Sequence, residues 1–82
     1  MYILIHVTSQ TQANGLLKLL SSRGIYATVR KTPFFISRTG CGYCIKIAPG
    51  ELERAMEAIK KSGMPYKAVY EVEGTRAGRL GL

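Results

Sequence analysis

The feature that most constrains the fold is a hydrophobic repeat whose period changes twice in each half of the chain. Residues 2–7 are a run of β-favouring residues and residues 25–30 alternate between apolar and polar, with a stretch of helical period between them. Residues 43–47 and 66–72 flank a second such stretch. A period of two is typical of strands, and a period near 3.6 is typical of amphipathic helices. The order strand–helix–strand is therefore predicted twice.

Both predicted helices carry signals at their ends. Either Thr8 or Ser9 can cap the first helix, and Gly24 can end it. Pro49 suits the first turn of the second helix, and Gly63 stops it. The apolar positions of the helices and strands should form one core, which we expect to contain Ile3, Ile5, Leu16, Leu20, Ile25, Val29, Ile45, Ile47, Leu52, Met56 and Ile59.

Two strand–helix–strand units predict an α+β fold of the ferredoxin-like βαββαβ type. This sandwich has a four-stranded antiparallel sheet with two helices on one face. Right-handed crossovers put the first and third strands in the centre of the sheet. We expect residues 1–73 to form this single domain. Residues 74–82 are basic and contain glycine but show no pattern, so we expect a mobile C-terminal tail.

Size and charge limit the classes of function. A chain of 82 residues has a small core and no room for a separate cofactor domain, which favours a carrier, binding or regulatory module without a cofactor over a stand-alone enzyme. The N-terminus lacks the features of a signal peptide and no apolar run is long enough to span a membrane, so we expect a cytoplasmic protein. The net charge of +7 suggests an acidic partner or serves solubility alone.

Cys41 is the strongest candidate for a reactive residue. In the predicted fold, the loop that holds it lies beside the start of the first helix, where the backbone N–H groups near Thr8 and Ser9 favour an anion. Nearby cations and a helix N-terminus lower the pKa of a thiol and so increase the nucleophilic thiolate. The cations Arg30, Lys31 and Arg38 flank the same loop, and Gly40 and Gly42 lie on either side of the cysteine. A loop thiol without a role is the alternative.

The second cysteine, Cys44, is expected within the third strand, opposite in phase to Tyr43, Ile45 and Ile47. It is either a small strand residue or a resolving thiol for Cys41. Zinc is disfavoured, because a site needs four ligands and His6 is the one histidine, so we expect no metal. A thioredoxin-type motif is also disfavoured, since that motif lies at the start of a helix.

Several short motifs stand out along the chain, namely Thr32-Pro33, Ile36-Ser37, Cys41-Gly42, Pro49-Gly50-Glu51-Leu52-Glu53 and Tyr70-Glu71-Val72. With these motifs, residues 2–73 resemble the selenium/sulfur carrier protein-like family of small bacterial domains. The chain departs from the family at Phe34-Phe35, where a charged residue commonly follows the Thr-Pro pair, and at Arg38-Thr39-Gly40.

The resemblance implies a carrier that holds sulfur or selenium on Cys41 as a persulfide or a selenosulfide. Its partners would be a donor protein of the cysteine desulfurase type and an acceptor enzyme. Arg30, Lys31 and Arg38 would then stabilise the thiolate or the anionic persulfide.

A different function would use the open face of the sheet. We expect that face to present a mixture of aromatic, polar and basic residues, namely Tyr2, Leu4, His6, Tyr26, Thr28, Arg30, Cys44, Lys46 and Lys67. Such a surface could stack nucleic-acid bases, form a homodimer or bind a regulatory partner. The sequence signature of RNA-recognition motifs is absent, and Tyr43 has the wrong phase, so we expect no specific binding of nucleic acid.

Overall fold

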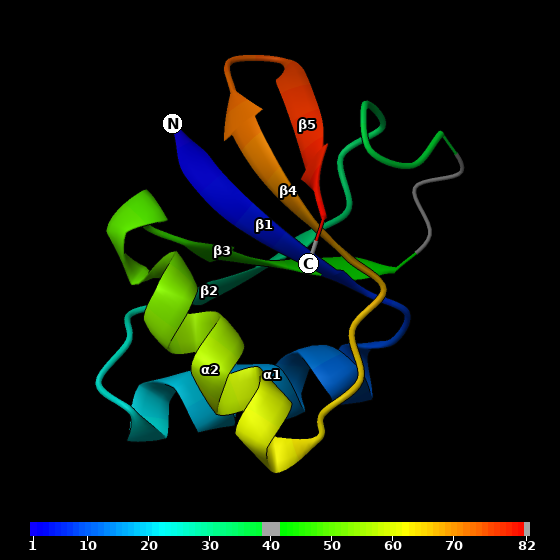
Figure 1. Ribbon diagram of the computed structural model, residues 1–82. Coiled ribbons are helices and arrows are strands. Elements are labelled where there is room, and N and C mark those ends of the chain that lie inside the picture. The colour runs from blue at the N-terminus through cyan, green and yellow to red at the C-terminus, as the bar shows by residue number, and fades with distance from the viewer. Residues whose placement is uncertain (39–41, 82) are drawn as a thin grey trace.

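The computed structural model describes residues 1–38 and 42–81 of the chain (Figure 1). Its elements are β1 (Tyr2–Val7), α1 (Gln10–Ser22), β2 (Thr28–Lys31), β3 (Tyr43–Ile47), the 3₁₀ turn η1 (Pro49–Glu51), α2 (Leu52–Ser62), β4 (Ala68–Glu73) and β5 (Arg76–Leu80). Residues 39–41, which include Gly40 and Cys41, and residue 82 lie outside the described residues. Within the described part, neither helix is long and apolar enough to cross a lipid bilayer.

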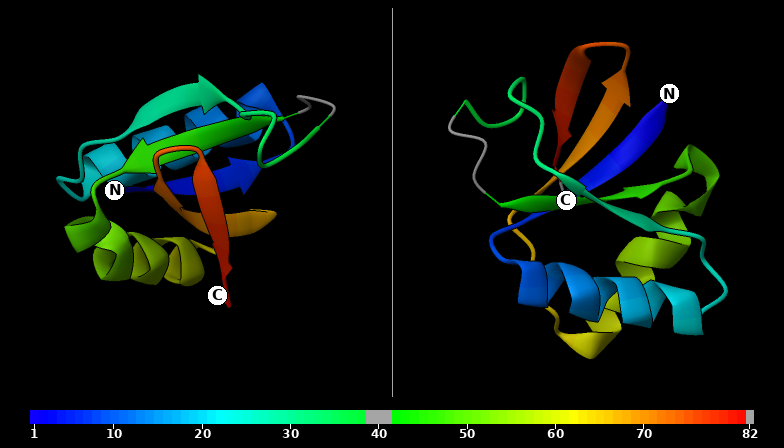
Figure 2. Two further views of the ribbon diagram at one scale, coloured as in Figure 1. Left: turned by 90° about the horizontal axis from the view of Figure 1, so that it is seen from above. Right: turned by 180° about the vertical axis from the view of Figure 1, so that it is seen from behind.

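The strands form one antiparallel sheet in the order β2-β3-β1-β4-β5. Both helices lie on the same side of this sheet (Figures 1 and 2). The predicted α+β class, with two helices and an antiparallel sheet, is therefore confirmed. The predicted number of strands is wrong, because the sheet has a fifth strand at the edge beside β4.

Strand β5 lies in the segment expected to be a tail without pattern. Glu73 pairs with Arg76, so Gly74 and Thr75 form a two-residue hairpin turn between β4 and β5. Gly74 has a φ of 63°, a conformation for which such turns favour glycine. The strand adds little to the core, since only Ala77 and Leu80 are partly buried. Its weak apolar pattern explains why periodicity did not indicate a strand.

The main core fills the space between the sheet and the two helices. It contains the predicted residues, with Val29 and Leu52 partly buried at its margin and the others buried. Side chains alternate along a strand, so Ile3, Ile5 and Val7 of β1 all point to this side. The predicted core is confirmed.

A second apolar cluster covers the other face of the sheet. Leu4 and Cys44 are only 1% and 0% exposed there, and Phe35 and Ile36 from the loop after β2 pack against the cluster that they form with Val72. The loop rises on the side of the sheet away from the helices (Figure 2, right). The expectation of an open face is therefore wrong for Leu4, His6 and Cys44, all of which are buried.

Two strand boundaries also differ from those predicted. Ile25 donates a backbone hydrogen bond of 2.9 Å to Leu20 at the end of α1, and pairing in β2 begins only at Thr28. Strand β4 begins at Ala68 rather than at residue 66. Lys67, which was expected on the open face, therefore precedes the strand.

Candidate functional site

The candidate site lies where β1 ends and β3 begins. Val7 pairs with Tyr43 across these strands, and Tyr43 pairs with Lys31 at the end of β2 on its other side. The backbone N–H of Thr32 donates to the carbonyl of Gly42 at 3.5 Å, which ties together the two ends of the intervening loop. Both flanks of the segment that carries Cys41 are therefore held at this end of the sheet (Figure 1).

Gly42 occupies a position that only glycine fits. Its φ is 87°, and a Cβ atom placed on it would lie 2.5 Å from the carbonyl oxygen of Val7 and 2.9 Å from Nε2 of His6. Real Cβ atoms do not approach other atoms so closely, and side chains rarely adopt this φ. The absence of a side chain thus lets the backbone directly after Cys41 pack against the end of β1.

The first turn of α1 begins beside this point, and its polar side chains are bound locally. The hydroxyl and the N–H of Thr8 both donate to Oε1 of Gln12, at 3.0 and 3.1 Å. Oγ of Ser9 accepts from the N–H of Gln12 at 3.2 Å, so Ser9 is the residue that caps the helix. A role for Thr8 and Ser9 in stabilising a thiolate stays a prediction, and their hydroxyls already have these partners.

The three predicted cations, Arg30, Lys31 and Arg38, are exposed. Within the described part of the chain, their side chains form no ion pair; the ion pairs there join Arg54 to Glu51 and Lys61 to Glu57. All five acidic residues belong to η1, α2 and β4. Positive charge at the ends of the loop is therefore not neutralised by a neighbouring carboxylate, and it would favour an anionic sulfur nearby.

Cys44 lies in the middle of the sheet, where it pairs with His6 on one side and with Arg30 on the other. Its Sγ atom is 3.7 Å from Oγ1 of the buried Thr32. Burial raises the pKa of the Cys44 thiol above its ordinary value, and the hydrogen bond with Thr32 opposes this shift more weakly. Cys44 therefore fits the interpretation of a small buried strand residue, whereas a resolving thiol must be reachable.

The burial of Cys44 predicts that its thiol is protected until the protein unfolds. In a Cys41→Ser variant, iodoacetamide at pH 7 should label Cys44 only as fast as the chain opens, and intact mass over time measures this. The raised pKa also has a consequence for stability. Above the ordinary thiol pKa of about 8.5, the unfolded state releases a proton that the folded state retains, so folding is weakened as pH rises.

The loss of folding stability with rising pH should be smaller in a Cys44→Ala variant. Urea unfolding of both proteins between about pH 8 and 10 measures the difference. Rapid labelling of Cys44 in native buffer, at the rate of a free thiol, would contradict the buried position.

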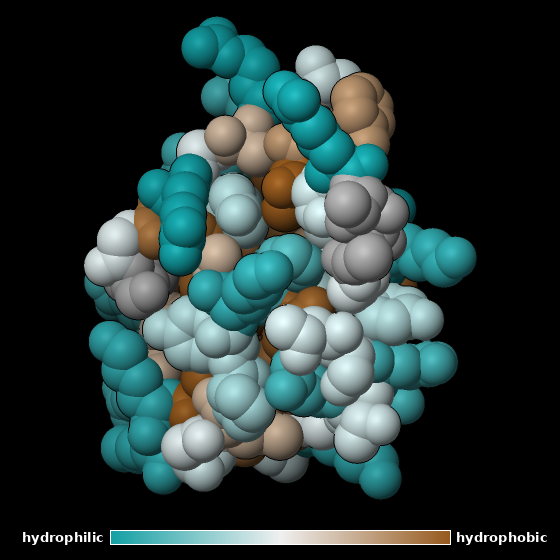
Figure 3. Space-filling model, turned by 90° about the vertical axis from the view of Figure 1, so that its right-hand side faces the viewer, coloured by the Kyte–Doolittle hydropathy of each residue, from teal (hydrophilic) through white to brown (hydrophobic). Residues whose placement is uncertain are grey.

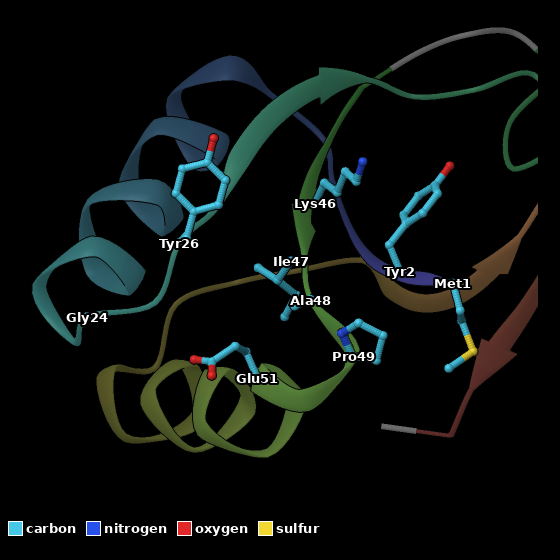
Figure 4. Close-up of a pocket in the computed structure, with 9 residues that line it drawn as sticks. All are labelled: Met1, Tyr2, Gly24, Tyr26, Lys46, Ile47, Ala48, Pro49 and Glu51. Carbon is cyan, nitrogen blue, oxygen red and sulfur yellow. The ribbon is translucent and has the colours of Figure 1, made fainter.

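A separate hollow lies at the opposite end of β1 and β3 (Figure 4). It has a volume of about 490 Å³ and is lined by Met1, Tyr2, Gly24, Tyr26, Lys46, Ile47, Ala48, Pro49 and Glu51. Nζ of Lys46 lies over the ring of Tyr2, 4.6 Å from its centre, while the ring of Tyr26 stands apart (Figure 4). Tyr2 and Ile47 belong to the strand ends remote from Val7 and Tyr43, so this hollow is not part of the candidate site.

Comparison with known proteins agrees with the motifs around the cysteines. The family model described as "Putative Se/S carrier protein-like" matches residues 2–71. The match includes both helices, strands β1 to β3, both cysteines and most of β4, and it ends before β5. No curated protein and no solved structure shows a significant match to the chain.

Proposed function

Because the chain belongs to the Se/S carrier protein-like family, we propose that it carries sulfur or selenium on Cys41, as a persulfide or a selenosulfide. The observation that carries this choice is the contrast between the two cysteines. Cys44 is buried in the second apolar cluster, whereas Cys41 is bonded to Gly42 at the base of a loop whose flanking cations form no ion pair within the described residues. A carrier thiol has to react with groups on other proteins, and a buried thiol cannot reach them.

The transfer step requires no oxidant and no cofactor. The Cys41 thiolate would attack the outer sulfur of a persulfide on the donor. The sulfur–sulfur bond of the donor breaks, and the donor leaves as a thiolate that takes up the proton lost by Cys41. A persulfide on Cys41 and a free thiol on the donor are the products. Outer selenium in place of outer sulfur gives the selenosulfide by the same exchange.

Electrostatics supports the thiolate and the anionic persulfide. Arg30, Lys31 and Arg38 supply exposed positive charge, and the start of α1 contributes the favourable end of a helix dipole. Exposed charges are screened by salt, so each of the three cations should stabilise the anionic sulfur only modestly. The total stabilisation should be divided among the three.

The remaining parts of the proposal concern setting and architecture. A donor protein and an acceptor protein would use the same cysteine in turn, and the cytoplasm would keep that thiol reduced. We also infer that β1 to β4 with the two helices form a ferredoxin-like unit, to which β5 is added at one edge. The strand order β2-β3-β1-β4 within the sheet supports this inference.

Thiol reactivity tests the proposal. At pH 7, Cys41 should react with iodoacetamide faster than Cys44, whose thiol is buried, and faster than an unperturbed thiol, because the cations on its loop would favour the thiolate. Arg38→Ala should slow Cys41 by less than about tenfold, since an exposed cation is screened. Arg76→Ala, on β5 at the other edge of the sheet, is the matched control and should leave the rate unchanged. Equal rates at the two cysteines would count against Cys41 as the carrier residue.

A further inference from the structure

The loop between β2 and β3 exposes an aromatic side chain to solvent. The ring of Phe34 is 77% exposed, although its neighbours Phe35 and Ile36 are packed on the second apolar cluster. Two backbone hydrogen bonds of 3.0 Å, from Ile36 and Ser37 to the carbonyl of Pro33, shape these residues into a turn. We call residues 33–37 the docking turn.

The docking turn presents Phe34 in a defined position. Its ring meets the ring of Phe35 edge to face, with 6.2 Å between the ring centres and 77° between the planes. Since Phe35 and Ile36 are packed on the sheet, the turn has little conformational freedom left to lose when a partner binds, and the entropic cost of binding is small. Burying an exposed aromatic ring in a pocket of a partner tightens a complex by about ten- to a hundredfold.

Charge around the turn indicates the chemistry of the partner. Lys31 precedes the turn and Arg38 follows it, and both are exposed. No carboxylate lies on this loop, because the acidic residues of the chain all belong to η1, α2 and β4. Figure 3 views this side of the molecule and shows long hydrophilic side chains around smaller apolar patches. A complementary partner would have an apolar pocket with carboxylates at its rim.

The loop connects the docking turn to the carrier cysteine. The bond from Thr32 to Gly42 closes its base, and Cys41 is covalently bonded to Gly42. A protein that binds the turn therefore contacts a segment that ends four residues before Cys41 in the chain.

We propose that the docking turn is the surface on which the sulfur-donating protein binds, with Phe34 in an apolar, acid-rimmed pocket of that protein. The inference rests on the proposed function, because docking serves to bring the donor's persulfide to Cys41. The docking proposal goes beyond the proposed function because it names the residue that recognises the donor and the kind of donor surface that receives this residue.

The test compares a protein donor with a small-molecule donor. The protein donor is a cysteine desulfurase supplied with cysteine, and the small donor is glutathione persulfide. Phe34→Ala should slow loading from the desulfurase by about tenfold or more and leave loading from glutathione persulfide unchanged. The variant should fold normally, since the Phe34 side chain is exposed, and a thermal melt checks this.

Tyr26→Ala is the matched control, because Tyr26 is an equally prominent aromatic, 83% exposed, at the far hollow. It should load at the wild-type rate from both donors. Raising the salt concentration should slow loading of the wild-type protein from the desulfurase, because the attraction between basic and acidic surfaces is screened.

Each other outcome overturns the docking proposal. Phe34→Ala could load from the desulfurase as fast as the wild type, or Tyr26→Ala could slow it equally. The wild type could also load from glutathione persulfide but not from the desulfurase, which would leave the proposed function standing without this docking surface. If neither donor loads Cys41, the proposed function itself fails.

Discussion

Replacing Gly42 with alanine is expected to lower the free energy of unfolding by about 2–4 kcal/mol. The backbone has a φ of 87° at this residue, and the new methyl group would meet the carbonyl oxygen of Val7 at 2.5 Å. Relief would require movement of β1, a strand in the interior of the sheet, or of the start of β3. Urea unfolding followed by circular dichroism measures the change.

Gly50→Ala is the control for this prediction. A Cβ atom at Gly50 would meet no heavy atom within 4 Å, and its backbone does not have positive φ. The substitution should change stability by less than about 0.5 kcal/mol. Equal losses in the two variants would contradict the close approach of Gly42 to β1.

Replacing Cys41 with serine is expected to abolish loading of the protein with sulfur or selenium. A hydroxyl has too high a pKa to supply the anionic nucleophile that opens the donor's persulfide bond. Cys44→Ser should reduce loading at most partly, because the Cys44 thiol is buried. Loading is measured as the fraction of protein whose intact mass increases after incubation with glutathione persulfide. Full loading of Cys41→Ser would exclude Cys41 as the carrier.

The part of the fold that periodicity describes could be predicted from the sequence. Ile3 and Ile5 alternate with Leu4, and Leu16 and Leu20 are one helical turn apart, so the side of each element that faces the main core follows from local spacing. Strand β5 was missed because Arg76 to Leu80 has almost no apolar alternation. The Gly74-Thr75 turn after a strand was the one local signal for it.

The covered face of the sheet could not be predicted in this way. Residues 31–42 show no period, and Phe35 and Ile36 are partly buried because they pack against a cluster whose members, Leu4, Cys44 and Val72, belong to three different strands. Such contacts depend on how a loop folds back, which local spacing does not encode.

The candidate site shows the same division. The phase of Cys44 correctly predicted the side of the sheet on which it lies, but not its burial in the second apolar cluster. Thr8 and Ser9 were correctly identified as candidates to cap a helix, and Ser9 is the cap. Gly42 was predicted only as a glycine beside Cys41, and its close approach to Val7 and His6 has no signal in the local sequence.

The most direct test of the account is to locate the transferred atom in the wild-type protein. After loading with persulfide, alkylation and trypsin, cleavage after Arg38 and Lys46 releases residues 39–46, which contain both cysteines. Fragmentation of this peptide between Gly42 and Tyr43 assigns the added mass to one of them. The account predicts the mass of one additional sulfur atom on the fragment with Cys41; the same mass on the fragment with Cys44, or on neither, would contradict it.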